Sequence, residues 1–147
     1  MSDIMPIVGS DDSTVPPDYP VAKFYDLLRT VTVNQSTSYK WNMDFPSRLP
    51  EVLQEAGFVN VHQDRRRIPI GRWPRAVQQR LVGLYFANVL REFAMATLVL
   101  YRELGLTEEE AVALLDDLKR CLARPSIHAY VAWTCVWAQK PPAASHS

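Results

Sequence analysis

The chain has 147 residues, of which 48% are apolar, and it contains four tryptophans, six tyrosines and five phenylalanines. This length and composition predict one packed domain and exclude a wholly disordered chain. Sixteen basic and sixteen acidic residues give a formal net charge of zero, which argues against a nucleic-acid-binding surface.

Targeting and redox signals are absent from the sequence. No apolar run approaches the roughly 18 to 20 residues of a membrane span. The N-terminal MSDIMPIVGSDD lacks the basic and apolar regions of a signal peptide. Cys121 and Cys135 lack the paired spacing of a zinc site or a disulfide framework. We therefore expect a cytoplasmic protein with no membrane contact, no metal and two buried free thiols.

The first half of the chain begins with residues 1–20, which are predicted to be irregular because prolines crowd the stretch 10–20. One domain is expected over 21–140 and a flexible tail over 141–147. Apolar residues at 21, 24, 27, 28 and 31 predict an amphipathic helix. A second helix over 46–58 stops at Gly57. The stretch 58–70 then has the pattern of a strand that emerges into solvent.

The second half contains two predicted helices and a strand. A long helix over about 75–104 has few polar residues, so we expect it to be covered on more than one face. The next helix begins at Thr107, which forms a capping box with Glu110. Residues 127–139 alternate like a strand and are largely apolar on both faces, which is typical of an inner strand of a layered sheet.

Four stretches carry a family resemblance. EAGFVNVHQDRRRIPIGRWP (55–74), YRELGLTEEEAVALLDDLKRCLARPSIHAY (101–130) and QKP (139–141) resemble the C-terminal portion of the fungal LaeA-like class I methyltransferases, which use S-adenosylmethionine. SDDST (10–14) resembles the segment that follows the fifth strand in that family. The resemblance implies an α+β fold, mainly helical, with a small antiparallel sheet formed by the last two strands.

The donor-binding half of that family has no counterpart in the sequence. Class I methyltransferases hold the donor on a glycine-rich turn after the first strand. Here the five glycines stand at 9, 57, 71, 83 and 105, and no two are closer than twelve positions. Only nine residues precede SDDST. We therefore expect a truncated chain that binds no S-adenosylmethionine, needs no cofactor and is not an active methyltransferase.

Truncation also has a consequence for assembly. In the resembled family the final strand is flanked by the fifth strand, so without it residues 127–139 would have an open edge and an exposed apolar face. We expect a homodimer in which this strand, or the apolar IMPIV at 4–8, completes the sheet.

Candidate site residues come from the aromatic and polar positions. Tyr85, Asn88 and Glu92 share one helix face by spacing. Glu92 is a candidate general acid or base, or the partner of an arginine at an interface. His128 is a candidate proton shuttle, although the resembled family has the same IHAY, which favours a structural role. Candidate catalytic residues are thus Tyr85, Asn88, Glu92 and His128, and the residues expected to bind a hydrophobic substrate are Trp41, Trp73, Tyr130 and Trp133.

Two functions from different classes follow. An apolar pocket with few hydrogen-bond donors accelerates a cyclisation by holding a flexible substrate near its reactive conformer. The leading hypothesis is therefore a cofactor-independent cyclase or isomerase of polyketide or terpenoid secondary metabolism in fungi, including a pericyclase of the Diels–Alder type. The alternative is a non-catalytic binding module that partners a full-length methyltransferase or a regulatory complex. A closed apolar pocket of several hundred Å³ favours the enzyme, and a flat apolar patch favours the module.

Overall fold

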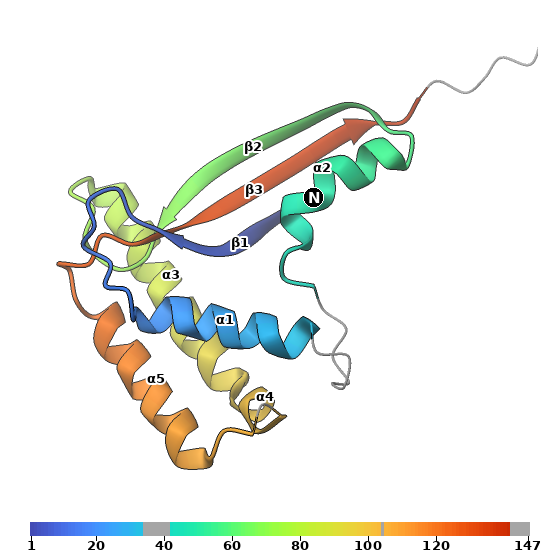
Figure 1. The fold of residues 1–147 in the computed structure, drawn as a ribbon. Coiled ribbons are helices and arrows are strands. Elements are labelled where there is room, and N and C mark those ends of the chain that lie inside the picture. The colour runs from blue at the N-terminus through green and yellow to red at the C-terminus, as the bar shows by residue number, and fades with distance from the viewer. Residues whose placement is uncertain (34–41, 104, 142–147) are drawn as a thin grey trace, which may run out of the picture.

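The computed structural model of the chain describes residues 1–33, 42–103 and 105–141. Within these ranges the elements in chain order are β1 (Ser2–Gly9), α1 (Pro20–Val33), α2 (Phe45–Glu55), β2 (Val59–Pro69), α3 (Val77–Ala96), α4 (Leu98–Glu103), α5 (Glu108–Leu122) and β3 (Tyr130–Gln139). Figure 1 shows the strands gathered at one end and most helices below them. The α+β class with a small antiparallel sheet is confirmed.

The three strands form one antiparallel sheet in the order β1-β3-β2. The strand that was expected to have an open edge, β3, is therefore central, which suits a strand with apolar residues on both faces. Residues 2–9, predicted to be irregular, instead form β1 and pair with β3 in the same chain. The prolines that favoured an irregular segment lie after this strand, except Pro6, which falls at a register shift between Met5 and Val8.

The outer edge of β1 has little backbone free for a further strand. Met1 and Val136 exchange two N–H···O bonds of 2.8 Å, so the N–H groups of Ile4 and other even-numbered residues at this end point away from β3. The Ile4 N–H donates to Asp3 Oδ1 at 2.7 Å, and Pro6 has no N–H. A dimer that extended the sheet at β1 would have to break this local hydrogen bond.

The opposite edge of the sheet, β2, is protected by charge and by a bulge. Arg65, Arg66 and Arg67 are exposed consecutive residues in the middle of this strand. The register shifts between Val59 and His62, where Asn60 has a φ of 52°. Charged side chains and bulges on an edge strand hinder the addition of another strand. The two edge strands of the sheet, β1 and β2, are thus protected against the addition of another strand in different ways.

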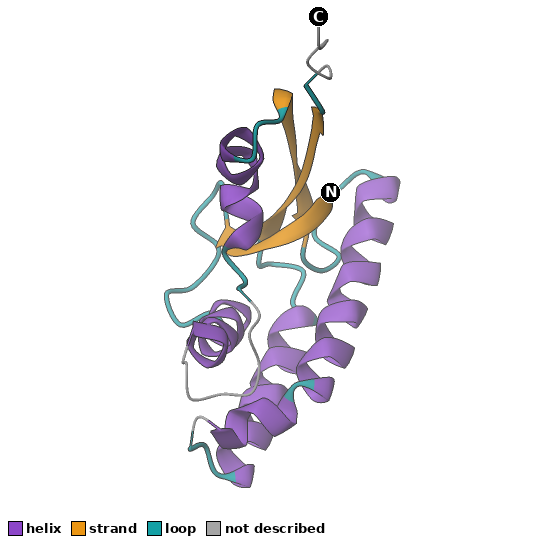
Figure 2. Ribbon diagram, turned by 90° about the vertical axis from the view of Figure 1, so that its right-hand side faces the viewer, coloured by secondary structure: helices purple, strands orange, loops and turns teal. Residues whose placement is uncertain are grey.

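The core lies between the sheet and the helices α1, α3 and α5. Figure 2 places α2 and the long helix α3 on opposite sides of the sheet. The sheet and the helices α1, α3 and α5 all contribute residues that are at most 2% exposed: Phe24 and Leu28 of α1, Leu90 and Ala94 of α3, Leu118 of α5, and Val131 of β3. Burying each large apolar side chain contributes roughly 1.5 to 3 kcal/mol. No helix in the described ranges has the length and apolarity to cross a membrane.

The helix predicted over 75–104 is two helices, because α3 ends at Ala96 and α4 begins at Leu98. Between them the buried Thr97 donates its hydroxyl to the carbonyl oxygens of Phe93, at 3.0 Å, and Ala94, at 3.2 Å. A threonine hydroxyl that bonds to carbonyls of the preceding turn competes with the backbone and bends the helix. The break is therefore built from a side chain that the apolar pattern of the sequence does not reveal.

The predicted capping box of α5 is confirmed. The Glu110 N–H donates to Thr107 Oγ1 at 3.2 Å, and the Thr107 N–H donates to Glu110 Oε2 at 2.8 Å. Three glutamates occupy the first turn, and Lys119 and Arg120 the last, as the helix dipole favours.

A close backbone contact fixes α3 to the loop that precedes it. The Gly71 N–H donates to the Gly83 carbonyl at 3.0 Å. A Cβ atom on Gly83 would lie 2.1 Å from the Gly71 carbonyl oxygen, so only glycine fits there. Gly71 itself has a φ of +90°, which also favours glycine.

Candidate functional site

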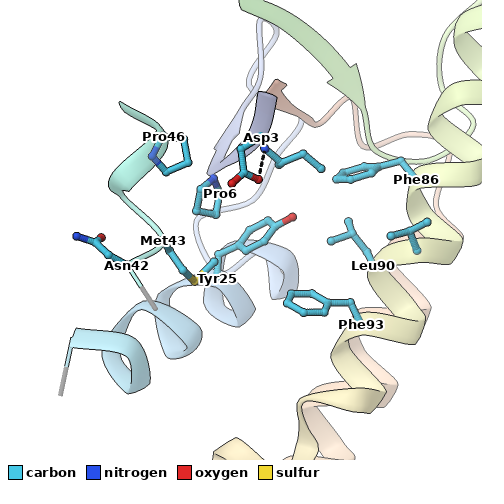
Figure 3. Close-up of a pocket in the computed structure, with 11 residues that line it drawn as sticks. Asp3, Pro6, Tyr25, Asn42, Met43, Pro46, Phe86, Leu90 and Phe93 are labelled. Carbon is cyan, nitrogen blue, oxygen red and sulfur yellow. Dashed lines mark hydrogen bonds between the residues drawn. The ribbon is translucent and has the colours of Figure 1, made fainter. Parts of the chain in front are cut away.

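An apolar cavity of about 160 Å³ lies between β1, the start of α2 and the helices α1 and α3 (Figure 3). Its lining is Asp3, Ile4, Pro6, Tyr25, Asn42, Met43, Pro46, Phe86, Val89, Leu90 and Phe93. The Tyr25 ring extends between Pro6 and Leu90, and burial raises the pKa of its hydroxyl well above the usual range. Typical ligand pockets measure about 300 to 1,000 Å³, so this cavity has room for a fragment of a metabolite rather than a whole one.

The three candidates on α3 share one face, as their spacing predicted, but that face is open to solvent. Tyr85 is 76% exposed, and Asn88 and Glu92 are exposed as well. None of the three lines the apolar cavity. Glu92 pairs with Arg91 at 2.9 Å, and its side chain is 64% exposed, so it is not enclosed in a pocket where it could face a substrate. The arginine partner is the one that the second interpretation of Glu92 expected.

A polar cluster at one end of the sheet brings together His128 and the segment after β1. The His128 ring nitrogen Nδ1 bonds to the Asp12 carboxylate, and the His128 backbone N–H donates to Thr14 Oγ1 at 2.8 Å. The ring packs against Trp73, with centroids 5.1 Å apart. Because Nδ1 is bonded to the Asp12 carboxylate, Nε2 is the ring nitrogen that can form a hydrogen bond with a ligand.

The same cluster includes Tyr130. Its hydroxyl donates to Asp11 Oδ1 at 3.2 Å. Arg67 pairs with Asp11 and lies 4.6 Å from the centroid of the Tyr130 ring. Trp73 Nε1 donates to the Ala129 carbonyl at 2.9 Å, which fixes the indole beside His128. The structure thus gathers three predicted residues, Trp73, His128 and Tyr130, but outside the apolar cavity.

The remaining predicted residues lie elsewhere. Trp133 is half-buried in the middle of β3, opposite Ile4 on one side and Arg66 on the other. Trp41 lies outside the described residues. Sequence reasoning missed Asp11 and Asp12 as members of the cluster. The available signal was the SDDST motif itself, which places two carboxylates directly after a strand.

Hydrogen bonds keep Asp12 ionised. Its Oδ1 accepts from the Thr14 hydroxyl at 2.8 Å, from the Thr14 N–H at 3.2 Å and from Ser10 Oγ at 3.0 Å. The Thr14 hydroxyl, and after it His128, hold the pKa of Asp12 well below its usual range. The carboxylate is therefore available to fix His128 across the whole physiological pH range.

Replacement of Asp12 by asparagine tests this arrangement. The folded-state pKa lies below the unfolded value of about 3.9, so the carboxylate stabilises the fold above about pH 4 and loses that effect as pH falls toward the lowered pKa. We expect Asp12→Asn to have a lower Tm than the native chain at pH 7, with a difference that narrows below pH 4. Differential scanning calorimetry of both proteins from pH 7 to about pH 2.5 measures this. Asp18→Asn, at an exposed position of the same segment, is the control, and equal Tm values for Asp12→Asn and the native chain at pH 7 contradict the prediction.

No group of three or more His, Cys, Asp or Glu side chains in the described ranges is placed to hold a metal ion. Cys121 and Cys135 are free thiols, as predicted; the expectation that both are buried is confirmed for Cys121, whereas Cys135 is only partly buried. Burial raises the pKa of the Cys121 thiol to about 11, which makes it unreactive at neutral pH.

An exposed apolar surface lies on α3. Seven large apolar side chains of this helix are 38% to 76% exposed: Val77, Leu81, Val82, Leu84, Tyr85, Val89 and Met95. We call this surface the outer face of α3. Four of its members recur every fourth residue from Val77 to Val89, so they form a continuous ridge. The expectation that this helix is covered on more than one face is wrong for the described chain, because the ridge has no cover there.

Comparison with known proteins places the chain among fungal proteins. It is 31% identical to the probable methyltransferase tdiE of Emericella nidulans over 97% of this chain and 44% of that protein. It is 30% identical to the methyltransferase pytC of Aspergillus terreus over 92% of this chain and 41% of that protein. The chain is related to fungal methyltransferases. A third relative, the secondary metabolism regulator LAE1 of Cochliobolus heterostrophus, is 29% identical over 82% of this chain and 39% of that protein.

This relationship agrees with the resemblance seen in the sequence, and the chain spans less than half the length of these relatives. No protein-family model matches the chain. No solved structure matches it.

The described residues do not fit the methyl donor of class I methyltransferases. Such a donor needs a glycine-rich turn whose backbone N–H groups face the ligand. Gly9 is followed by SDDST, which folds onto His128. Gly71 and Gly83 meet in space, but their backbones bond to each other at 3.0 Å and leave no room between them. No step is therefore assigned to S-adenosylmethionine.

Proposed function

We propose that this chain is a binding module of fungal secondary metabolism that packs, through the outer face of α3, against a methyltransferase-type polypeptide. The observation that carries the proposal is the ridge of large apolar side chains on one helix. Contiguous exposed apolar patches of this kind mark interaction sites on soluble proteins. One relative is a regulator of secondary metabolism, and the others are methyltransferases, which supports this choice of process and partner.

The length of the relatives favours this kind of partner. The chain covers 39% to 44% of each, so these proteins contain more polypeptide than the module itself. The ridge from Val77 to Val89 covers twelve residue steps of α3, or about 18 Å, so it presents several turns of the helix to a partner. Asn88 and Glu92 lie beside the ridge and supply polar contacts that set the register of a partner.

The cavity separates this proposal from the leading hypothesis of the sequence. A cyclase of the Diels–Alder type has to enclose most of its substrate, and the apolar cavity measures about 160 Å³. Of the four predicted catalytic residues, three stand on or beside the exposed ridge and the fourth in the polar cluster. The module is therefore the function that the geometry supports best.

The module is tested by titration calorimetry with each purified full-length methyltransferase-type protein of the producing fungus. We expect one of them to bind with micromolar affinity or better. Leu81→Glu/Tyr85→Glu should weaken that binding at least 100-fold, because two carboxylates would be buried in an apolar interface. Val112→Glu/Trp137→Glu, at two exposed apolar positions on other elements, is the matched control and should leave the affinity unchanged.

Two results would overturn the proposal. One is the absence of binding to all of these proteins, or equal binding by Leu81→Glu/Tyr85→Glu. The other is self-association, measured by sedimentation velocity, that the same variant abolishes. In that case a second copy covers the ridge, in a dimer that differs from the expected one, which would complete the sheet.

A cofactor-independent cyclase or isomerase is the second candidate, and the Asp12–His128 pair favours it. A carboxylate that holds Nδ1 of an imidazole fixes its tautomer and makes Nε2 a general base. The test is to delete the gene, identify the metabolite that accumulates and supply it to the pure protein without S-adenosylmethionine. Conversion that His128→Gln abolishes supports the enzyme, and a rate equal to that in buffer rejects it.

A further inference from the structure

Two adjoining hollows lie on the side of α3 that faces α5. The larger measures about 380 Å³, and the smaller about 250 Å³. They share Arg72 and Ala123, so they form one continuous depression. Its apolar wall comes from Leu84 and Ala87 of α3 and Leu122 of α5. Its cations are Arg72, Arg80, Arg91 and Lys119, and we call the depression the basic groove.

The charge of the basic groove is one-sided. Four cations line the two hollows and no carboxylate does, although the whole chain has equal numbers of basic and acidic residues. Arg91 and Lys119 have acidic partners just outside, Glu92 at 2.9 Å and Asp116 at 3.3 Å. The side chains of Arg72 and Arg80 have neither an ion pair nor a hydrogen bond with the described residues.

The unpaired arginines stand on parts of the fold that are fixed to each other. Arg72 follows Gly71, whose N–H is bonded to Gly83 of α3, and Arg80 stands one turn earlier on the same helix. Arg80 is also half-buried, although no carboxylate offsets its charge. The backbones of the two arginines are thus held near each other, and the planar guanidinium group of each can bind a carboxylate or phosphate through two parallel hydrogen bonds.

We propose that the basic groove binds an amphipathic anion, a molecule with a carboxylate or phosphate head and an apolar body. Arg72 and Arg80 bind the head through charge-assisted hydrogen bonds. Leu84, Ala87 and Leu122 contact the body, and Asn88 supplies a neutral polar contact beside them. A volume of about 380 Å³ falls within the usual range for small-molecule sites. The basic groove shares Leu84 with the outer face of α3, but Leu81 and Tyr85 do not line it, so the two proposals can be tested separately.

The test uses three eight-carbon probes, octanoate, octyl phosphate and octanol, titrated into the native chain and followed by ¹H–¹⁵N NMR. We expect at least one anion to shift the amide signals of Arg72, Asn88 and Leu122. Octanol should bind at least tenfold more weakly than that anion, and added salt should lower the affinity for the anion. Whichever anion binds more tightly identifies the head group.

Variants separate the groove from general attraction. Arg72→Gln/Arg80→Gln should weaken the anion at least tenfold, while Arg48→Gln/Arg65→Gln, with the same loss of charge elsewhere, should not. Leu81→Ala/Tyr85→Ala, which adds no charge, should still bind the anion, because neither residue lines the basic groove. The proposal is overturned if octanol binds as tightly as both anions, or if the two arginine pairs have equal effects.

Discussion

Replacing Gly83 by alanine is expected to lower the free energy of unfolding by about 3 kcal/mol. The new Cβ atom would lie 2.1 Å from the Gly71 carbonyl oxygen, which is backbone and cannot rotate away. Relief requires α3 to move from the loop and to break the 3.0 Å hydrogen bond between Gly71 and Gly83. For a chain of this size the Tm should fall by about 6 to 12 °C. Urea denaturation followed by circular dichroism measures the loss.

The sign of this effect distinguishes packing from helix propensity. Glycine to alanine inside an exposed helix stabilises by about 1 kcal/mol. Gln79→Ala, on an exposed position of the same helix, reports propensity alone and should change stability by less than about 0.5 kcal/mol. A Gly83→Ala protein as stable as the native chain would show that α3 does not approach Gly71 this closely.

Replacing Phe24 by alanine is expected to cost about 3 to 5 kcal/mol, because it leaves a cavity at the centre of the core. Phe24 is fully buried on α1, and its ring meets that of Phe93 edge to face, with centroids 5.8 Å apart. This contact joins α1 to α3. The unfolding midpoint in urea should fall, while the slope of the transition stays the same.

A conservative change at the same position gives the control. Phe24→Leu keeps most of the volume and should cost less than about 1.5 kcal/mol. If Phe24→Ala costs no more than Phe24→Leu, then α1 does not pack against α3 as described.

Local patterns of the sequence predicted the elements that depend on neighbours along the chain. The Thr107 and Glu110 pair located the start of α5, because a capping box is made within four residues. The alternation of apolar residues located β3, and the polar stretch before Ile68 predicted β2 as a strand that emerges into solvent. The helix over 20–33 followed from its apolar period.

Features that depend on distant partners were not predicted. β1 is a short strand with a proline, and its assignment needs β3, which lies more than 120 positions later. The contact of Asp12 with His128 spans 116 positions and has no local signal. Exposure of the α3 ridge was also missed, because an apolar helix has the same sequence pattern whether its second face is covered or bare. For the same reason Tyr85 and Glu92 were taken for pocket residues.

The two shielded edges of the sheet determine how this protein can associate without harm. A protein with an exposed apolar helix and an unpaired strand edge would polymerise, because each molecule added to the sheet would present another unpaired edge to the next. Here the Asp3 carboxylate accepts a hydrogen bond from the outward-facing N–H of Ile4 on the β1 edge. Three exposed arginines and a bulge protect the β2 edge. A concentrated solution of the protein should therefore form no fibres by the addition of strands at these edges.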